Sequence, residues 1–323
     1  MRLVSFDLPS GARHIGAMLP GATRIADFSA ANDAPWARDM LALIDAGADG
    51  LAAARACLAA PRVTHDLAAV KLLAPVPEPR QMRDFLCFEK HLRQARTQRH
   101  LFGITGYPTD PAKVDVPRVW YEEPVYYKCN RFAVVGSGHD VVCPSYCQML
   151  DYELEFGIFL GKRGKNIARA DAGQHIFGYC IFNDFSARDQ QMREMQAQLG
   201  PTKGKDFDTA NVMGPWLVTA DEVPDPYALT MVARVNGVEW SRGTSGDMHH
   251  KFADILAHVS RDETVYPGEF FGSGTVGSGC GLELGRFLKM GDVVELEITG
   301  LGILTNRVVA SAAAQQETQE TLS

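Results

Sequence analysis

Two glutamates, Glu153 and Glu155, are separated by a single residue in the segment Asp-Tyr-Glu-Leu-Glu-Phe at residues 151–156. If this alternating segment is a strand, Glu153 and Glu155 point to one face and the apolar side chains between them point to the other. Two carboxylates about 7 Å apart along a strand repel each other unless solvent or a cation screens them. The pair is therefore either a solvated strand face or half of a site for a hard cation, since Mg²⁺, Mn²⁺ and Ca²⁺ prefer oxygen ligands.

Other chemically active side chains stand at positions that could join this site. Asp184 ends an apolar run and precedes a charged helical segment, so it is either a helix cap or a ligand at the carboxyl end of a strand. Asp84 and His91 lie seven residues apart and, taken alone, could be ordinary surface residues. The glycine-rich run at residues 272–279 lacks both the following helix and the Gly-Lys-Ser/Thr ending of a phosphate loop, which argues against nucleotide binding.

The elements that must position these groups are mostly strands. From about residue 80 to residue 312, short runs rich in β-branched and aromatic residues alternate with Gly- and Pro-containing turns. The clearest strands are predicted at residues 132–136, 154–160, 179–182, 229–235 and 293–298. Helices are predicted at residues 39–46 and 50–56, where strong helix formers recur with three- and four-residue apolar spacing. We therefore expect a β-rich α+β fold.

A proline-rich stretch gives the best domain boundary. Residues 75, 77 and 79 are all proline, a pattern that neither a helix nor a central strand tolerates. We expect a small N-terminal α+β domain at residues 1–76 and a catalytic domain at residues 77–312. The polar residues 313–323 have no apolar face and are expected to form a frayed tail.

Composition limits the kind of partner. The 323 residues are 46% apolar and 22% charged, as in ordinary globular proteins. A net charge of −7 without a long basic run argues against nucleic acid or an anionic membrane and favours a small-molecule partner. The sequence has neither a run approaching the ~20 apolar residues of a membrane span nor the apolar core of a signal peptide, so we expect a cytoplasmic protein. Its seven cysteines are scattered without a C-x-x-C pair, as reduced thiols usually are.

Taken in order, these segments resemble the fumarylacetoacetate hydrolase family. The resemblance covers nearly all of residues 80–310 and runs through residues 84–91, 150–155, 175–189, 205–209, 214–216, 267–275 and 291–294. It implies a mixed β-sandwich roll behind a small N-terminal domain, and a homodimer. It also implies a divalent metal, with Mg²⁺ favoured and Mn²⁺ or Ca²⁺ as alternatives. The metal ligands of the family match Glu153, Glu155 and Asp184, and Asp84 matches a fourth acidic ligand of the true fumarylacetoacetate hydrolases.

The same resemblance implies the catalytic groups. His91 matches the family's catalytic base, and Glu283 matches the carboxylate that orients it. Lys205 and Gln191 resemble donors to the carbonyl and the carbanion. Decarboxylating and tautomerising relatives more often build their His–Glu pair elsewhere, on a mobile helix, so the match favours hydrolysis. Positions that contact the substrate in the family match Tyr127 and Thr275.

Two positions depart from the family pattern toward apolar side chains. The fumarylacetoacetate enzymes carry tyrosines where this chain has Leu86 and Met195. The arginine expected nine residues after His91 is His100, although Arg99 stands next to it. An apolar wall loses the preference for a polar substrate end and gains affinity for carbon. We therefore expect an alkyl- or aryl-substituted substrate to be preferred over fumarylacetoacetate.

The residues and the resemblance together predict a reaction. Four carboxylates against the single charge of Lys205 need a divalent cation, which also stabilises a departing enolate as a Lewis acid. A histidine near neutrality can take the proton of a water molecule. We expect a metal-dependent hydrolase that cleaves a C–C bond in a β-diketone or acylpyruvate in aromatic catabolism. The alternatives are a 2-keto acid decarboxylase, tautomerase or lyase that uses the same metal site, and a protein that binds such a ligand without turnover.

Overall fold

The chain folds into one large mixed sheet and a smaller sheet that share a hydrophobic core. The computed structural model describes residues 1–311, so the predicted tail at residues 313–323 lies outside the described residues. The large sheet has the strand order β4-β3-β2-β1-β14-β12-β11-β17-β6-β7, with β5 paired to β1 and β8 paired to β14. The smaller sheet has the order β16-β15-β18-β19-β9, and β10 pairs with β13. The α+β class is confirmed.

The large sheet contains β1 (Arg2–Asp7), β2 (Arg13–Met18), β3 (Arg24–Asp27), β4 (Thr64–Asp66), β5 (Lys71–Leu72), β6 (Met82–Phe85), β7 (Tyr126–Lys128), β8 (Val134–Val135), β11 (Leu154–Leu160), β12 (Ile176–Asp184), β14 (Asn211–Thr219) and β17 (Phe270–Gly272). The other strands are β9 (Asp140–Cys143), β10 (Leu150–Asp151), β13 (Ser186–Ala187), β15 (Thr230–Val235), β16 (Val238–Thr244), β18 (Val293–Ile298) and β19 (Gly302–Ala310). The α-helices are α1 (Phe28–Ala31), α2 (Met40–Asp45), α3 (Gly47–Ala59), α4 (Glu89–Thr97), α5 (Arg118–Glu122), α6 (Arg188–Met195), α7 (Thr202–Lys205), α8 (Phe252–Val259) and α9 (Gly281–Leu284).

Strand β11 is the centre of the fold. All seven of its residues are buried, because both faces of the strand are covered. Leu154, Phe156 and Ile158 pack into the core shared with the smaller sheet, whereas Phe159 packs into the core beneath the N-terminal segment. Alternation along the strand therefore places Glu155 on the same face as Phe159.

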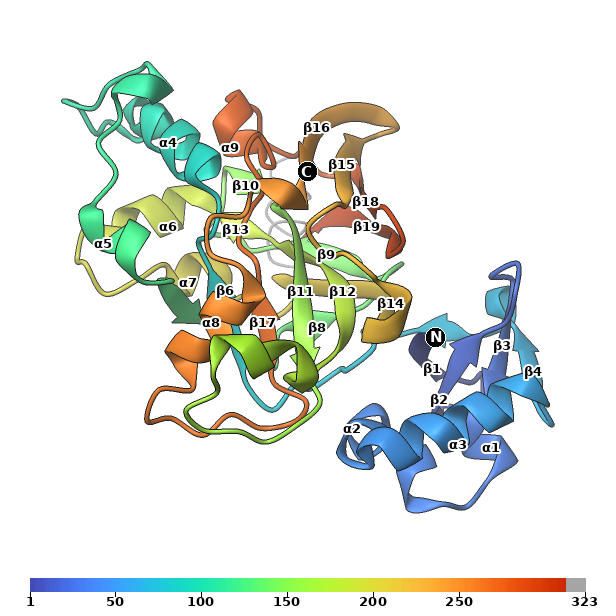
Figure 1. Ribbon diagram of the computed structural model, residues 1–323. Coiled ribbons are helices and arrows are strands. Elements are labelled where there is room, and N and C mark those ends of the chain that lie inside the picture. Colours follow the sequence, from blue (N-terminus) through green and yellow to red (C-terminus); the bar gives the residue numbers. More distant parts are fainter. Residues whose placement is uncertain (312–323) are drawn as a thin grey trace, which may run out of the picture.

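The N-terminal segment extends the large sheet. β1 pairs antiparallel with β14, so the hairpin strands of the first residues continue the sheet of the following segment. Helices α2 and α3 lie against β1–β3 at the blue end of the chain (Figure 1). Because hydrogen bonds cross between the two segments, the domain boundary near residue 76 stays a prediction.

Local structure follows the sequence pattern closely where burial is strong. The strands predicted at residues 154–160 and 293–298 form as β11 and β18 with those bounds. The strand predicted at residues 132–136 shrinks to β8, because Phe132 lies in an exposed turn. Figure 1 shows α4, α6 and α7 gathered at one end of the central strands, beside β10 and β13. None of the helices within residues 1–311 is long and apolar enough to cross a membrane.

Candidate active site

Neighbouring strands bring three carboxylates to one face of the large sheet. Asp184 ends β12, Glu155 is the second residue of β11, and Asp84 lies in β6. Strand β17 separates β11 from β6 and places Gly272 directly beside Asp84. A Cβ atom on Gly272 would lie 2.3 Å from Oδ1 of Asp84, so any larger residue would displace this carboxylate. The fold thus gathers residues that lie up to 100 positions apart in the sequence into one acidic cluster, which consists of Asp84, Glu155 and Asp184.

The cluster is buried. Carboxylate oxygens of Asp84, Glu155 and Asp184 all lie within 4.8 Å of one another. The residues are 5%, 0% and 0% exposed, so the solvated strand face considered for Glu155 is wrong. Asp184 is not a helix cap either, because α6 begins at Arg188 with Ala187 at its N-cap. Glu155 and Asp184 are thus buried close together, and their role as metal ligands stays a prediction.

Burial makes the negative charges of this cluster unfavourable. It raises the pKa of Asp84 to about 8, with the charge of Asp184 adding to the effect. Burial and then the charge of Asp84 raise the pKa of Glu155 well above its usual range. Burial also raises the pKa of Asp184 to about 6, although Lys205 opposes the shift. A bound cation would favour the ionised form of all three groups.

The residues fit a hard divalent cation. Oε2 of Glu155 and Oδ1 of Asp184 are buried and have no hydrogen-bond partner. Buried polar atoms without a partner are rare in proteins and need an explanation. The donor set is entirely carboxylate oxygen, which is the chemistry that Mg²⁺, Mn²⁺ and Ca²⁺ select. Asp84, Glu155 and Asp184 are therefore the residues that could hold the cation.

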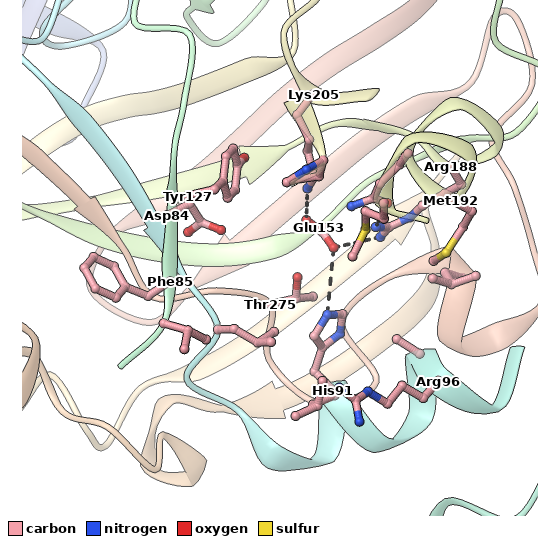
Figure 2. A pocket seen from close by; sticks show the side chains of 18 of the residues that line it. Asp84, Phe85, His91, Arg96, Tyr127, Glu153, Arg188, Met192, Lys205 and Thr275 are labelled. Carbon is pink, nitrogen blue, oxygen red and sulfur yellow. Dashed lines mark hydrogen bonds and ion pairs between the residues drawn. The ribbon is translucent and has the colours of Figure 1, made fainter. Parts of the chain in front are cut away.

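Glu153, the fourth predicted ligand, has a different environment. Its Oε1 accepts a hydrogen bond from Nη2 of Arg188 at 2.7 Å, and its Oε2 is bound by Nζ of Lys205 (Figure 2). Burial raises the pKa of Glu153, but Arg188 and Lys205 outweigh that effect and hold the pKa below its ordinary value. Lys205 also donates to Oδ2 of Asp184 at 2.5 Å. Glu153 is thus paired with two buried, positively charged side chains, and one of them, Lys205, also contacts the acidic cluster.

Arg188 is the principal residue that the sequence interpretation missed. Its guanidinium contacts Asp151 at 2.8 Å, Glu153 at 2.7 Å and Oε1 of Gln191 at 2.9 Å. Gln191 therefore presents its amide NH₂ group as the part available to a ligand. A signal was present, because Arg188 lies three residues before Gln191 and so shares its helix face. If all of them were ionised, five buried carboxylates (Asp84, Asp151, Glu153, Glu155 and Asp184) would face only the two positive charges of Arg188 and Lys205.

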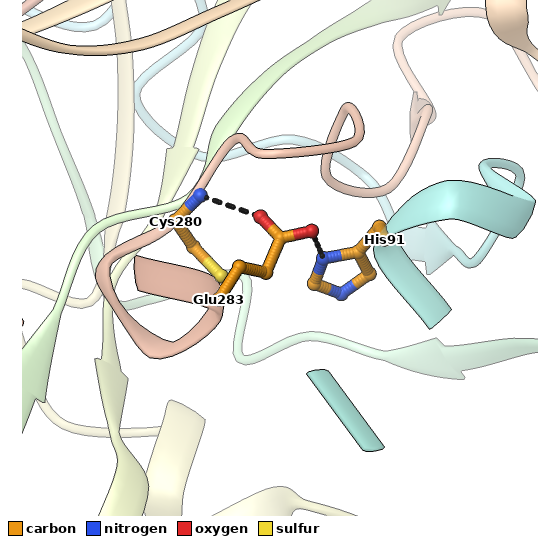
Figure 3. Close-up of side chains that lie close together, drawn as sticks. All are labelled: His91, Cys280 and Glu283. Carbon is orange, nitrogen blue, oxygen red and sulfur yellow. Dashed lines mark hydrogen bonds and ion pairs between the residues drawn. The ribbon is translucent and has the colours of Figure 1, made fainter. Parts of the chain in front are cut away.

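The predicted His–Glu pair, His91 and Glu283, also lies close to Glu153. Nδ1 of His91 is 3.3 Å from Oε1 of Glu283, without the alignment of a hydrogen bond (Figure 3). Nε2 of His91 points toward Glu153 and is 4.0 Å from its Oε1 (Figure 2). Glu283 accepts backbone hydrogen bonds from Ser278 and Cys280, each 3.0 Å long. These bonds fix the carboxylate that orients the imidazole.

His91 and Asp84 both border a cavity of about 310 Å³. Its polar lining includes His91, Glu153, Gln191 and Lys205, which are four of the predicted site residues. Arg96 of α4 and Arg99 also line it, and Figure 2 shows Arg96 beside His91. The apolar part of the lining includes Leu86, Leu92, Met192, Met195 and Leu282. Leu86 and Met195 thus border the cavity, and their role as a substrate wall stays a prediction.

The two predicted substrate contacts are bound to carboxylates instead. Tyr127 donates from its hydroxyl to Oδ2 of Asp184 at 2.6 Å. Thr275 donates from Oγ1 to Oε1 of Glu155 at 3.1 Å. Both residues still line the cavity, so a role in substrate contact stays a prediction. Burial and the charge of Asp184 raise the pKa of Tyr127 well above its usual range, which keeps the phenol a donor.

The α+β fold with a buried carboxylate cluster beside a His–Glu pair defines an enzyme site. A family model described as fumarylacetoacetate (FAA) hydrolase, C-terminal, matches residues 81–309. The chain therefore belongs to the fumarylacetoacetate hydrolase family, as its motifs predicted.

Relatives within this family have several activities. A mitochondrial oxaloacetate tautomerase of Homo sapiens is 33% identical over 311 residues, covering 96% of this chain and 92% of the relative. An oxaloacetate tautomerase of Bacillus subtilis is 32% identical over 247 residues, covering 76% of this chain and 75% of the relative. Among solved structures, a similar fold is found in maleylpyruvate hydrolase from Sphingobium, determined in complex with manganese(II) ion and pyruvate. The two chains have a TM-score of 0.73 and 26% sequence identity, and the match covers 96% of this chain and 100% of that chain. The comparisons therefore support an enzyme without singling out the predicted C–C hydrolysis.

Proposed function

We propose that this protein is a metal-dependent keto–enol tautomerase of a small 2-oxo dicarboxylic acid such as oxaloacetate. The observation that carries the proposal is the imidazole of His91, which faces the cavity between Glu283 and the acidic cluster. A base beside a hard cation is what proton transfer between carbon and oxygen requires. The human and Bacillus tautomerases, similar over most of their length, support this choice over hydrolysis.

The side chains of the cavity divide the work of this reaction. A divalent cation held by Asp84, Glu155 and Asp184 would supply Lewis-acid stabilisation of the enolate oxygen. Nε2 of His91 removes a proton from the carbon next to the ketone, and Glu283 stabilises the imidazolium that forms. Return of the proton to the oxygen completes the conversion of ketone to enol, and the reverse sequence of steps converts enol to ketone.

Two arginines support a dicarboxylate as the substrate. Arg188 and Lys205 are neutralised by acidic side chains. Within the described residues, neither Arg96 nor Arg99 forms an ion pair, although both line the cavity. Arg96 donates to the backbone oxygen of Asp115, and Arg99 stacks over Tyr107. A second carboxylate of the substrate would satisfy these charges. A cavity of about 310 Å³ is at the small end of ligand pockets, which span ~300–1,000 Å³.

Hydrolysis of an acylpyruvate or β-diketone is the second candidate, and the apolar wall of Leu86 and Met195 favours it. His91 would take a proton from water, and the resulting hydroxide would add to the acyl carbonyl. Cleavage of the C–C bond then yields a carboxylic acid and an enolate, whose charge Gln191 and Lys205 stabilise before its carbon is protonated. The named activity of the Sphingobium relative supports this alternative. Mg²⁺ as the native metal, a homodimer and a cytoplasmic location stay predictions, and the human relative is named as mitochondrial.

Product analysis separates the candidates. The purified protein, loaded with Mg²⁺ or Mn²⁺, is incubated separately with enol oxaloacetate and with an aryl-substituted acylpyruvate. The enol absorbance is followed in the ultraviolet, and the products are identified by mass. A tautomerase converts enol to ketone at constant mass, a hydrolase releases two acids, and a decarboxylase releases carbon dioxide. His91→Ala protein and chelated wild-type protein are the controls. Release of two acids from the acylpyruvate, with no acceleration of the oxaloacetate step, would replace the tautomerase with the hydrolase.

A further inference from the structure

The three carboxylates of the acidic cluster share one arrangement. In each, a protein donor binds one oxygen: the backbone N–H of Gly274 binds Oδ1 of Asp84 at 3.2 Å, and Thr275 binds Oε1 of Glu155. At Asp184, Tyr127 and Lys205 both bind Oδ2. The other oxygens of Glu155 and Asp184, Oε2 and Oδ1, are buried without a partner. The donors therefore leave one free oxygen on each of these two carboxylates.

Strand register explains why the hydroxyl of Tyr127 reaches Asp184. Tyr127 in β7 is the direct cross-strand partner of Asp84 in β6, so both side chains project from the same face of the sheet. Figure 2 shows the Tyr127 ring next to Asp84. The short bond of 2.6 Å then spans the cluster to the end of β12. Tyr127 thereby connects the strands that carry two of the three carboxylates.

We propose that Tyr127 and Thr275 are positioning residues of the metal centre, which hold Asp184 and Glu155 so that Oδ1 and Oε2 face a divalent cation. This inference rests on the metal-dependent part of the proposed function. Donors behind metal ligands fix the orientation of the ligands, and their loss typically lowers metal affinity by roughly 10- to 100-fold. A substrate contact at the same residues predicts something different, namely unchanged metal binding in the absence of substrate.

Titration with Mn²⁺ in the absence of substrate distinguishes the positioning role from substrate contact. Electron paramagnetic resonance measures the concentration of free Mn²⁺ at each point of the titration. We expect Tyr127→Phe to weaken Mn²⁺ binding by roughly 10-fold or more while kcat returns close to the wild-type value at saturating Mn²⁺. Tyr126→Phe is the matched control, because Tyr126 lies next in the same strand and borders the same cavity. Its ring packs against Phe85, and within the described residues its hydroxyl forms no hydrogen bond to a carboxylate of the cluster. This control should bind Mn²⁺ as the wild type does.

A pair of variants at residue 275 keeps the test decisive if Tyr127→Phe fails to fold. Thr275→Val removes the hydroxyl at nearly constant shape and should weaken Mn²⁺ binding, whereas Thr275→Ser retains the hydroxyl and should restore it. Affinities within twofold of wild type for both Tyr127→Phe and Thr275→Val would overturn the positioning role. A rise in the substrate KM without any change in Mn²⁺ affinity would assign the residues to substrate contact. Absence of Mn²⁺ binding by the wild type would reject the metal centre itself, whereas loss of only the tautomerase activity would leave this inference standing.

Discussion

Nδ1 of His91 lies 3.3 Å from Oε1 of Glu283, so α4 and α9 each supply one member of a single His–Glu pair. The two residues are 192 positions apart in the sequence and are 7% and 8% exposed in the fold. The carboxylate is held by backbone donors, and the opposite ring nitrogen faces the cavity. This geometry suits a histidine that exchanges protons with a ligand and a glutamate that only orients it.

Glu283→Gln should lower kcat by roughly 10-fold or more and leave Mn²⁺ affinity within twofold of wild type. Glutamine retains the shape but not the charge that favours the imidazolium. His91→Ala should lower the rate further, by roughly 10²- to 10⁴-fold, the usual contribution of a positioned base. Steady-state kinetics at saturating metal check both variants. Near-normal turnover by His91→Ala would mean that another group moves the proton.

Glu155→Gln and Glu153→Gln should have different effects, although both were predicted as metal ligands. Glu155 has a free buried oxygen, whereas Arg188 and Lys205 occupy both oxygens of Glu153. We expect Glu155→Gln to lower Mn²⁺ affinity by roughly 100-fold, beyond the usual effect of a residue behind the ligands. Glu153→Gln should lower affinity less than 10-fold while reducing kcat. Calorimetric titration with Mn²⁺ measures the affinities of both variants, and Glu239→Gln, at an exposed position, is the control. Equal losses of Mn²⁺ affinity in Glu155→Gln and Glu153→Gln would make Glu153 a ligand as well.

Stability of the metal-free protein should decline as the pH rises from about 4 to about 8. In this range the folded protein keeps the proton of Asp84, whose pKa is raised from 3.8 to about 8, while the unfolded chain has lost it. A raised pKa in the folded state means that stability is greatest at low pH, with a slope of at most about 1.4 kcal/mol per pH unit for this group.

Urea unfolding with a chelator at several pH values measures this slope. Asp84→Asn should have a shallower decline than the wild type, because asparagine does not titrate. Saturating Mg²⁺ should stabilise the wild type most at high pH, where the carboxylates are ionised. Parallel pH profiles for the two proteins would show that Asp84 does not carry the shifted pKa.

Arg96→Met should raise the KM for oxaloacetate by roughly 10-fold, because a hydrogen bond to a charged group contributes about 1.5–3 kcal/mol. The KM for a substrate that lacks the second carboxylate should change little. Met keeps much of the apolar stem of arginine, so lost packing is limited. Arg242→Met, at an exposed site, is the control. An equal rise in KM for both substrates would remove Arg96 from carboxylate recognition.

The sequence predicted the parts of the site that local pattern and family motifs encode. Alternation at residues 151–156 was enough to place Glu155 on one face of β11, and the strand bounds followed from an apolar run that is buried on both faces. The position of Glu283 near His91 came from the family resemblance alone. Leu86 and Met195 both border the cavity, and their contact with a substrate stays a prediction.

Long-range partners were outside the reach of these patterns. Arg188 binds Asp151 and Glu153, which lie 37 and 35 residues earlier, and no local spacing encodes that choice. The bond from Tyr127 to Asp184 spans 57 residues and depends on the order of strands in the sheet. Sequence reasoning therefore proposed a set of carboxylates but could not tell which of their oxygens are free and which are occupied.

The loss of the enol absorbance of oxaloacetate in the ultraviolet tests the proposed function most directly. Mn²⁺-loaded wild-type protein should accelerate this loss over buffer containing the same metal, with the keto acid as the only product. Chelated protein and metal-loaded His91→Ala should both be slower by roughly 10²-fold or more. If the loaded wild type is no faster than metal in buffer, or if chelated protein is equally active, then His91 and the acidic cluster of Asp84, Glu155 and Asp184 do not form a metal-dependent tautomerase.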